Sequence, residues 1–343
     1  MYSFRNDYSE GAHPSVLKAL IDTNLEQTPG YGTDRYCEEA RALIREKIAV
    51  PDADVHFLVG GTQVNLVACA AFLRPFEAVI APESGHPLIH ETGALEATGH
   101  RVLSAPSRDG KLRPEAVAAL CRAHSSEHMV RPRMLYLSDS SELGTAYTKE
   151  ELSALHNTCK EYQLYSYLDG ARLGCGMVSS TAPLSWTDLG ETLDAFTIGG
   201  TKNGLLFGEA LVITNDALKA DFRSHMKQRG ALLAKGRLLG VQFRAILEND
   251  LYLENARHAN ALAQHLQAGI EALGYSMLLP SPTNQIFPIF PNDLLERLCS
   301  LYEYEVQQPM DEQSTCIRLV TSWATPPEAV EQFLDDLARL RAI

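Results

Sequence analysis

The sequence lacks the features that mark a membrane-spanning or disulfide-linked protein. Its longest apolar stretch, residues 66–73, is far shorter than the ~20 residues that a membrane helix needs. Charged residues stand at positions 5 and 7, so we expect no signal peptide and no membrane partner. The seven cysteines form no Cys-x-x-Cys pair, which argues against a disulfide framework or a zinc knuckle. We therefore expect free thiols, a cytoplasmic location and no bound metal.

Basic residues are also scarce relative to acidic ones. The chain has 30 Lys and Arg against 43 Asp and Glu, a net charge of −13. Because an acidic surface repels phosphate backbones, we expect no nucleic-acid partner. The 45% of hydrophobic and 21% of charged residues are typical of a folded globular chain and exclude disorder, collagen and coiled coil. A length of 343 residues suggests about two domains.

Short β-like runs alternate with helical patterns in the first part of the chain. This alternation predicts an α/β fold with parallel strand pairing and helices on both faces of one sheet. The expected strands are residues 55–59, 78–81, 101–104, 134–137, 164–169, 195–198 and 210–213. The expected helices between them include residues 38–48, 63–73, 115–122 and 149–161.

The pattern changes after about residue 235. Residues 238–274 are almost continuously helical in character. Strands at 285–290 and 316–321 follow, with helices at 293–302 and 327–342. We predict an N-terminal arm and large domain over residues 1–240. Residues 241–343 then form a long connecting helix and a smaller α+β domain.

In sheets of this kind ligands bind at the C-terminal ends of the strands. The first candidate there is Gly60-Gly61-Thr62-Gln63. Small residues at a helix N-terminus suit an anion, and the Thr62 hydroxyl is a plausible N-cap. An ordinary strand-to-helix turn explains the stretch equally well, and the spacing matches neither a dinucleotide nor a Walker A motif.

Three more candidates are single charged residues in strands or after them. Asp169 ends a strand, where it is either functional or part of a turn or salt bridge with Arg172. Lys202 lies among small residues, where desolvation would lower its pKa as a Schiff-base lysine requires. A flexible loop is the alternative. Arg318 stands alone in an apolar strand, with a guanidinium that fits a carboxylate, unless it faces solvent.

Together these stretches resemble the fold-type-I pyridoxal-phosphate (PLP) enzymes, and within them the threonine aldolase and β-eliminating lyase family. The resemblance covers nearly the whole chain and implies a mainly parallel sheet between helices, plus a smaller C-terminal α+β domain. It rests on the motifs Phe4-Arg5-Asn6-Asp7, Gly30-Tyr31-Gly32-Thr33-Asp34, Gly61-Thr62-Gln63, His86, Asp169-Gly170-Ala171-Arg172, Thr201-Lys202-Asn203-Gly204 and Ile317-Arg318-Leu319-Val320-Thr321.

The resemblance also implies a role for each residue that would hold the cofactor. Lys202 would join PLP as a Schiff base. Asp169 would sit against the pyridine nitrogen and keep it protonated, so that the ring can accept electrons. His86 would stack on the ring and is the leading candidate for a general base. The phosphate would be cradled by Gly61, Thr62 and Gln63.

On the substrate side, the resemblance implies that Arg318 clamps the carboxylate of a small amino acid. Arg172 would assist it or hydrogen-bond the phenolic oxygen of the cofactor. Asn6 and Tyr31 are further candidates for substrate contacts. We expect a homodimer or homotetramer with shared active sites. Residues that would reach the neighbouring subunit's site, unless they form a solvated loop, are Arg229 and Lys235.

The implied reaction is cleavage of the Cα–Cβ bond of β-hydroxy-α-amino acids, such as threonine, allo-threonine or phenylserine, to glycine and an aldehyde. Another PLP reaction (β-elimination, racemisation or transamination) and a non-catalytic binding protein stay open as alternatives. Departures from the family pattern point to a divergent branch. Asn6 replaces a Ser, Ser322 replaces a His, and a second active-site His is missing from the stretch Ser138-Asp139-Ser140-Ser141 that precedes Glu142.

Overall fold

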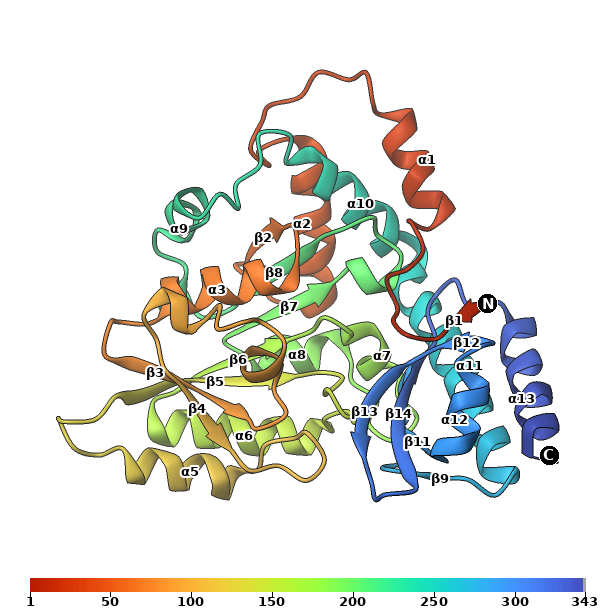
Figure 1. Ribbon diagram of the computed structural model, residues 1–343. Helices are drawn as coiled ribbons and strands as arrows, with labels where there is room; N and C mark the ends of the chain where they lie inside the picture. The colour runs from red at the N-terminus through yellow and green to blue at the C-terminus, as the bar shows by residue number, and fades with distance from the viewer. Residues whose placement is uncertain (342–343) are drawn as a thin grey trace.

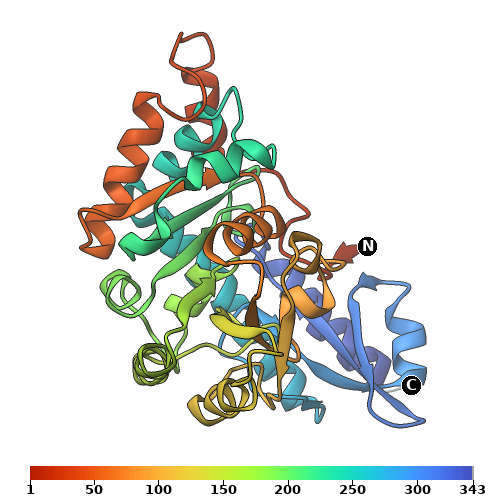
Figure 2. The same cartoon turned by 90° about the vertical axis from the view of Figure 1, so that its left-hand side faces the viewer.

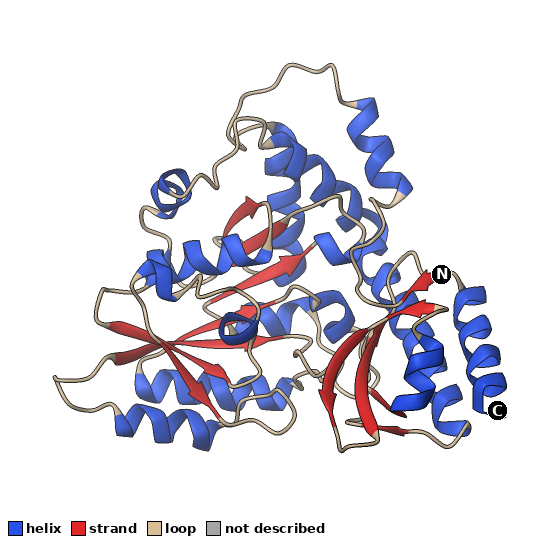
Figure 3. Ribbon diagram, viewed as in Figure 1, coloured by secondary structure: helices blue, strands red, loops and turns tan. Residues whose placement is uncertain are grey.

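The computed structural model describes residues 1–341 as two units built around separate sheets (Figure 1 and Figure 3). The large unit holds a seven-stranded sheet in the order β2-β8-β7-β6-β5-β3-β4. Every strand in it runs parallel except β8, which is antiparallel to both neighbours. The strands are β2 (Asp54–Leu58), β3 (Glu77–Pro82), β4 (Val102–Ala105), β5 (Arg131–Ser138), β6 (Tyr165–Asp169), β7 (Ala195–Gly199) and β8 (Glu209–Ile213).

The mainly parallel sheet is confirmed, whereas β8 departs from the predicted alternation. Residues 200–208 connect β7 to β8 and contain only a short 3₁₀ turn, η2 (Thr201–Asn203). A parallel crossover needs about a dozen residues or more, so this short connection can only return the chain in the opposite direction. As a result, the start of β8 lies at the same edge of the sheet as the ends of its neighbours.

Helices cover both faces of this sheet, because neighbouring strand residues point to opposite sides. In β3, Ala78 and Ile80 join one buried cluster while Val79 and Ala81 join the other. Both views place α1, α2 and α10 together at one end of the unit (Figure 1 and Figure 2). The helices are α1 (Pro14–Asp22), α2 (Arg35–Ile48), α3 (Gly61–Phe72), α4 (His86–Ile89), α5 (Pro114–Ala123), α6 (Lys149–Tyr162), α7 (Leu173–Met177), α8 (Trp186–Thr192), α9 (Phe222–Gln228) and α10 (Arg237–Leu247).

Residues 238–274, predicted to be almost continuously helical, form two helices with a break between them. The chain ends α10 at Leu247 and restarts as α11 (Leu251–Ala272). Between them Asn249 and Asp250 take the left-handed conformation, with φ of 55° and 60°. Asn and Asp tolerate this region better than other residues with a side chain, and apolar periodicity resumes on both sides, so the pattern alone hides the break.

The small unit carries an antiparallel sheet in the order β10-β14-β11-β9, with β13 also paired to β14. The predicted strand over residues 285–290 is interrupted at Phe287, and β13 was not predicted because its residues are mostly polar. The predicted helix end at Ala342 lies outside the described residues. The elements are β9 (Ser276–Met277), β10 (Gln285–Ile286), β11 (Pro288–Pro291), α12 (Asn292–Leu298), β13 (Glu305–Pro309), β14 (Ser314–Val320) and α13 (Pro327–Arg341).

The N-terminal arm joins this small unit. Strand β1 (Tyr2–Ser3) pairs in parallel with β12 (Tyr302–Glu303). The Phe4 ring lies 6.0 Å from that of Tyr302 and 5.5 Å from that of Phe333. The arm therefore brings residues 5–8 to the space between the units, while the domain boundary near residue 240 stays a prediction. Within residues 1–341, no helix combines the length and the apolar character that a bilayer span requires.

The ends of β6 and β7 approach so closely that Gly170 leaves no room for a side chain. A Cβ at this position would lie 2.0 Å from the Thr197 carbonyl oxygen. We expect Gly170→Ala to lower the free energy of unfolding by about 2–3 kcal/mol or more, as overpacked sites do. Urea denaturation measures this. Gly11→Ala, whose Cβ would meet no atom within 4 Å, is the control; equal midpoints for the two variants would contradict the close packing.

Candidate active site

The polar residues singled out in the sequence meet at one edge of the large sheet, because parallel strands end on the same side. Two adjoining hollows form there, which we call together the Lys202 cleft. The cradle-side hollow is lined by Tyr8, Gly60, Gly61, Thr62, His86, His90, Ser138, Glu142, Asp169, Arg172, Thr201, Lys202 and Glu209, among others. The arginine-side hollow shares Tyr8, His86, His90, Glu142, Arg172 and Lys202 and adds Gln285, Glu305 and Arg318 from the small unit.

Asp169 is buried at the end of β6 inside a set of hydrogen bonds. Its Oδ2 accepts from Tyr136 Oη at 2.6 Å and from Asn65 Nδ2 at 2.9 Å, and its Oδ1 accepts from the Ala171 backbone N–H at 2.9 Å. Burial by itself raises the pKa of a carboxyl group. The charge of His86 and these three donors outweigh burial and lower the pKa of Asp169, so it stays a carboxylate.

The His86 ring is held in place by a second buried acid. Its Nδ1 lies 2.8 Å from Glu91 Oε1, which also accepts from Asn65 Nδ2 at 2.7 Å. The Glu91 side chain is fully buried while that of His86 is 35% exposed. A carboxylate at Nδ1 favours a proton on that nitrogen and fixes the orientation of the ring.

Lys202 lies on the η2 turn, directly after β7. The turn is held from outside: Asn203 Nδ2 donates to the Tyr252 carbonyl at 2.7 Å, and Asn255 Nδ2 donates to the Asn203 carbonyl at 3.0 Å. These bonds argue against the flexible-loop interpretation of this segment. Burial and the nearby Arg172 lower the pKa of Lys202, although Asp7, Asp169 and Glu209 pull in the opposite direction.

Arg172 and Arg318 bring positive charge to the cleft from both units. Arg172 binds buried Asp7 through Nε at 2.7 Å and Nη2 at 3.1 Å, and Asn284 Nδ2 of the small unit donates to the same carboxylate at 2.9 Å. Arg318 is half-buried, and its Nε has no hydrogen-bond partner in the described chain. Burial and Arg172 lower the pKa of Arg318. Both features suit an anionic ligand between the two guanidinium groups.

The Gly60–Gly61 turn opens α3 toward the cleft. A Cβ at either glycine would meet no atom within 4 Å, so the turn faces open space. Gly60 is the N-cap and supplies no side-chain capping bond, which leaves backbone N–H groups of the first turn for an anion. The prediction of Thr62 as N-cap is wrong, because Thr62 lies inside the helix. The Gln63 side chain turns back, and its Oε1 accepts from the Val59 backbone N–H at 3.3 Å.

Besides Gln63, four predicted residues lie outside the lining of the cleft within one chain. Asn6 Oδ1 accepts from the Tyr8 backbone N–H at 2.9 Å and shapes the arm instead. Tyr31 lies in a separate hollow with Arg223, whose Nη2 donates to its carbonyl at 3.1 Å. The two others, whose contribution to a neighbouring subunit stays a prediction, are Arg229 and Lys235.

Sequence reasoning missed the partners that hold the predicted residues. Asn65 interrupts the apolar run of α3, and this lone polar residue in a buried helix is the signal that could have found it. Tyr136, on the fully apolar end of β5, is indistinguishable from a core residue in the sequence. Asp7 appeared within a family motif, but its contact with Arg172 spans 165 positions. Across the described chain, no cluster of three or more His, Cys, Asp or Glu side chains could hold a metal ion.

The fold and the cleft define an α/β protein of the fold-type-I class. In this chain a lysine that follows strand β7 and a buried carboxylate at the end of the neighbouring strand β6 line the same cleft. A model of the β-eliminating lyase family matches residues 4–291, and the chain belongs to this family. It is 33% identical, over 86% of each chain, to a low specificity L-threonine aldolase of Pseudomonas aeruginosa.

Solved structures agree with this assignment. A threonine aldolase of Leishmania major superposes with a TM-score of 0.98, 47% identity and 99% coverage of both chains. A Thermus thermophilus aspartate aminotransferase mutant superposes with a TM-score of 0.68 at 18% identity, covering 97% of this chain and 89% of the other, which supports the fold alone. The family and the fold imply use of PLP.

The cleft fits PLP on its own chemistry. The open Gly60–Gly61 turn suits a phosphate, Lys202 offers an amine of lowered pKa, and Asp169 offers an ionised carboxylate. Glu209, at the start of β8, has a buried Oε2 without a partner in the described chain. Burial and Asp169 raise the pKa of Glu209 to about 8, so at neutral pH this group adds little negative charge near a phosphate.

The Asp7–Arg172 pair predicts a pH-dependent stability. Burial alone would raise the pKa of Asp7, but Arg172, Lys202 and Asn284 lower it below 3.8 in the folded protein. The stabilisation that the ionised Asp7 carboxylate gives the fold is therefore fully present above the pKa that Asp7 has in the unfolded chain. It is lost as the pH falls through the lower pKa that Asp7 has in the folded protein. We expect Asp7→Asn to lower the free energy of unfolding by about 3–5 kcal/mol at neutral pH, because Arg172 loses its partner.

Urea denaturation over a pH series tests this. The difference in the free energy of unfolding between wild type and Asp7→Asn should become smaller below roughly pH 4. Asp22→Asn is the control, because the Lys18–Asp22 pair is exposed and should contribute at most ~1 kcal/mol. If this difference in the free energy of unfolding did not change with pH, the charge of Asp7 would not be what stabilises the fold.

Proposed function

We propose that this protein is a PLP-dependent aldehyde-lyase that cleaves the Cα–Cβ bond of β-hydroxy-α-amino acids to glycine and an aldehyde. The observation that carries the proposal is Lys202 with a lowered pKa and an ionised Asp169 in one cleft. Family membership and 47% identity to the threonine aldolase of Leishmania major support the reaction class. Threonine, allo-threonine and phenylserine are the substrates to test.

PLP, when bound, supplies an electron sink for the pair left on the substrate Cα. The residues of this chain supply the rest. Lys202 would provide the amine that links covalently to the cofactor aldehyde, and its lowered pKa favours the neutral amine that this link requires. Asp169 would keep a proton on the pyridine nitrogen, because the donors around this carboxylate keep it charged. The first turn of α3, from Gly61 to Gln63, offers N–H groups to the phosphate.

Substrate orientation decides which Cα bond breaks, because only the bond perpendicular to the conjugated plane can release its electrons into the ring. Arg318 would bind the substrate carboxylate from the arginine-side hollow. Arg172 is held against Asp7 and presents its remaining donors toward the cleft. His86, fixed by Glu91, would cover the ring face. The two arginines and Lys202 locally offset the negative charge of cofactor and substrate in an acidic protein.

Release of aldehyde is the direct test of this function. The PLP-loaded protein should liberate aldehyde from at least one of L-threonine, L-allo-threonine and phenylserine, measured by coupled oxidation of NADH. Lys202→Ala is the control and should release none, since the amine is lost while the cleft remains. No aldehyde from any of the three substrates would contradict the proposal. Pyruvate and ammonia from serine would indicate β-elimination, and amino transfer to a keto acid would indicate transamination.

The roles of Lys202 and Asp169 can be separated. Protein mixed with PLP should become yellow and lose its visible absorption band on borohydride reduction, with added mass on the peptide that contains Lys202. Asp169→Asn should retain this adduct but lose cleavage by about 10²–10³-fold, because a neutral amide stabilises the ring charge poorly. Mass spectrometry and steady-state rates measure the two effects. An adduct on a different lysine would contradict the assignment.

A further inference from the structure

Glu142 is a carboxyl group of the Lys202 cleft to which no role has been given above. It follows the end of β5, and it lines both the cradle-side and the arginine-side hollow. Its Oε1 accepts from the His86 backbone N–H at 2.7 Å and from Ser138 Oγ at 2.8 Å. Its Oε2 is shielded from solvent and has no hydrogen-bond partner among residues 1–341. One oxygen thus holds the group in place, and the other is free to accept a proton.

The other carboxyl groups of the cleft are placed differently. Asp169 and Glu209 border only the cradle-side hollow, and Glu305 borders only the arginine-side hollow, where it binds Arg5 at 2.9 Å. Among the acids that line the cleft in the described chain, Glu142 alone borders both hollows. A substrate whose carboxylate lies at Arg318 and whose amino group faces Lys202 must extend through this shared space.

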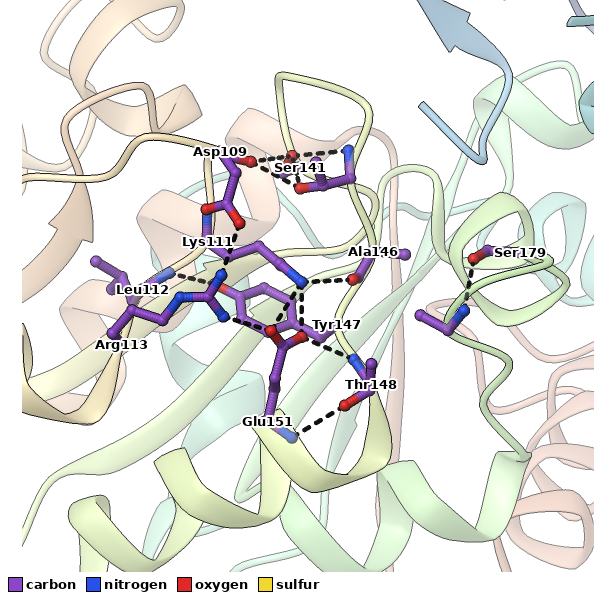
Figure 4. Close-up of polar contacts among 12 residues, drawn as sticks. Asp109, Lys111, Leu112, Arg113, Ser141, Ala146, Tyr147, Thr148, Glu151 and Ser179 are labelled. Carbon is purple, nitrogen blue, oxygen red and sulfur yellow. Dashed lines mark hydrogen bonds and ion pairs between the residues drawn. The ribbon is translucent and has the colours of Figure 1, made fainter. Parts of the chain in front are cut away.

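The loop that carries Glu142 is held rigidly on both sides. On the large-unit side, Thr145 Oγ1 donates to the Asp109 carbonyl at 2.7 Å. Figure 4 shows a second contact on this side, in which Lys111 Nζ donates to the Ala146 carbonyl at 3.1 Å. On the other side, Ser281 Oγ and Thr283 Oγ1 of the small unit donate to the Gly144 carbonyl at 2.8 and 3.0 Å. A side chain on such a loop is preorganised, which catalysis requires.

The start of α6 strengthens this anchor. Thr148 and Glu151 form a reciprocal capping box, and Glu151 also binds Lys111 at 2.7 Å and Arg113 (Figure 4). The Tyr147 hydroxyl accepts from the Leu112 backbone N–H at 2.8 Å. None of these bonds involves Glu142, so a substitution of that side chain leaves them intact.

His86 alone does not meet the need for a base near the substrate side chain. A ring that covers the cofactor with its face holds its N–H bonds and any free nitrogen lone pair in its own plane, where they point sideways. Nδ1 is already committed to Glu91. Burial also raises the pKa of Glu142 against the bonds from Ser138 and the His86 backbone, which makes this carboxylate a stronger proton acceptor than a solvated one.

We propose that Glu142 is the catalytic base that accepts the β-hydroxyl proton when the Cα–Cβ bond breaks. The inference rests on the proposed lyase function. The O–H bond breaks, and its electron pair becomes the second C–O bond of the aldehyde. The Cα–Cβ pair stays with Cα, and the proton is held at Glu142 Oε2 before it passes to solvent.

Glu142→Gln tests this role with little change of shape, because the amide oxygen still accepts from the His86 backbone and from Ser138. Aldehyde release from β-hydroxy amino acids should fall by about 10²–10⁴-fold, the usual contribution of a general base. Exchange of the glycine Cα proton for deuterium, followed by NMR, should keep its wild-type rate, because glycine has no hydroxyl. Glu83→Gln, which removes an exposed charge outside the cleft, is the control for net charge.

Binding gives a readout that does not depend on turnover. L-Serine and L-alanine differ only in the β-hydroxyl, and their dissociation constants follow from the change in visible absorption on rapid mixing. Wild type should prefer serine by roughly tenfold or more, as a hydrogen bond to a charged group provides. The preference should shrink in Glu142→Gln and return in part in Glu142→Asp, which restores a carboxylate.

The outcomes separate this inference from the proposed function. Equal loss of aldehyde release and glycine exchange in Glu142→Gln would make Glu142 structural and overturn the inference. Unchanged aldehyde release would overturn it as well, as would a loss seen in His90→Gln instead. If wild type exchanges glycine but cleaves nothing, the lyase function fails. In that case the tighter binding of L-serine than of L-alanine still tests whether Glu142 contacts the β-hydroxyl. If wild type bound the two amino acids equally well, this contact would be ruled out too.

Discussion

The cleft depends on keeping Asp169 charged in a buried position. A carboxylate without partners would take up a proton there, because burial disfavours charge. Tyr136 and Asn65 prevent this by donating to the same oxygen from β5 and α3, and Ala171 donates from the turn that follows β6. Asn65 also binds Glu91, which orients His86. One buried amide therefore couples the Asp169 carboxylate to the His86 ring through Glu91.

A second network ties the two units together at the same place. Asp7 arrives on the N-terminal arm, Arg172 comes from the large unit and Asn284 from the small one. All three meet in a buried ion pair, so the arm, both units and the charge balance of the cleft are linked. The loop from Ser141 to Thr148 makes a similar bridge, with the base proposed for the reaction at its inner side. Each bridge includes a residue that lines the Lys202 cleft, Arg172 in the first and Glu142 in the second.

Much of the fold follows from periodicity. The strands of the large sheet and its longer helices α2, α3, α5, α6 and the start of α10 were predicted within a few residues, because buried parallel strands read as short apolar runs and helices as amphipathic repeats. The shorter helices α1, α4, α7, α8 and α9 were not predicted. The antiparallel direction of β8 and the break at Asn249 were not, since both depend on connection geometry. Lys202, Asp169, Arg172 and Arg318 were identified by their setting and meet in one cleft. The capping role assigned to Thr62 was wrong, because a helix start depends on backbone angles.

The sequence by itself determined the fold class, the family and the main residues that line the Lys202 cleft, because strand-end motifs lie within short stretches of chain. The tertiary structure alone decided which side chains hold those residues. Asn65 and Asp169 are 104 positions apart, and Asp7 and Arg172 are 165 apart. Only the packed edge of the sheet and the N-terminal arm bring these side chains within hydrogen-bond distance of one another. The free oxygen of Glu142 has the same origin, because its position follows from contacts on both sides of its loop.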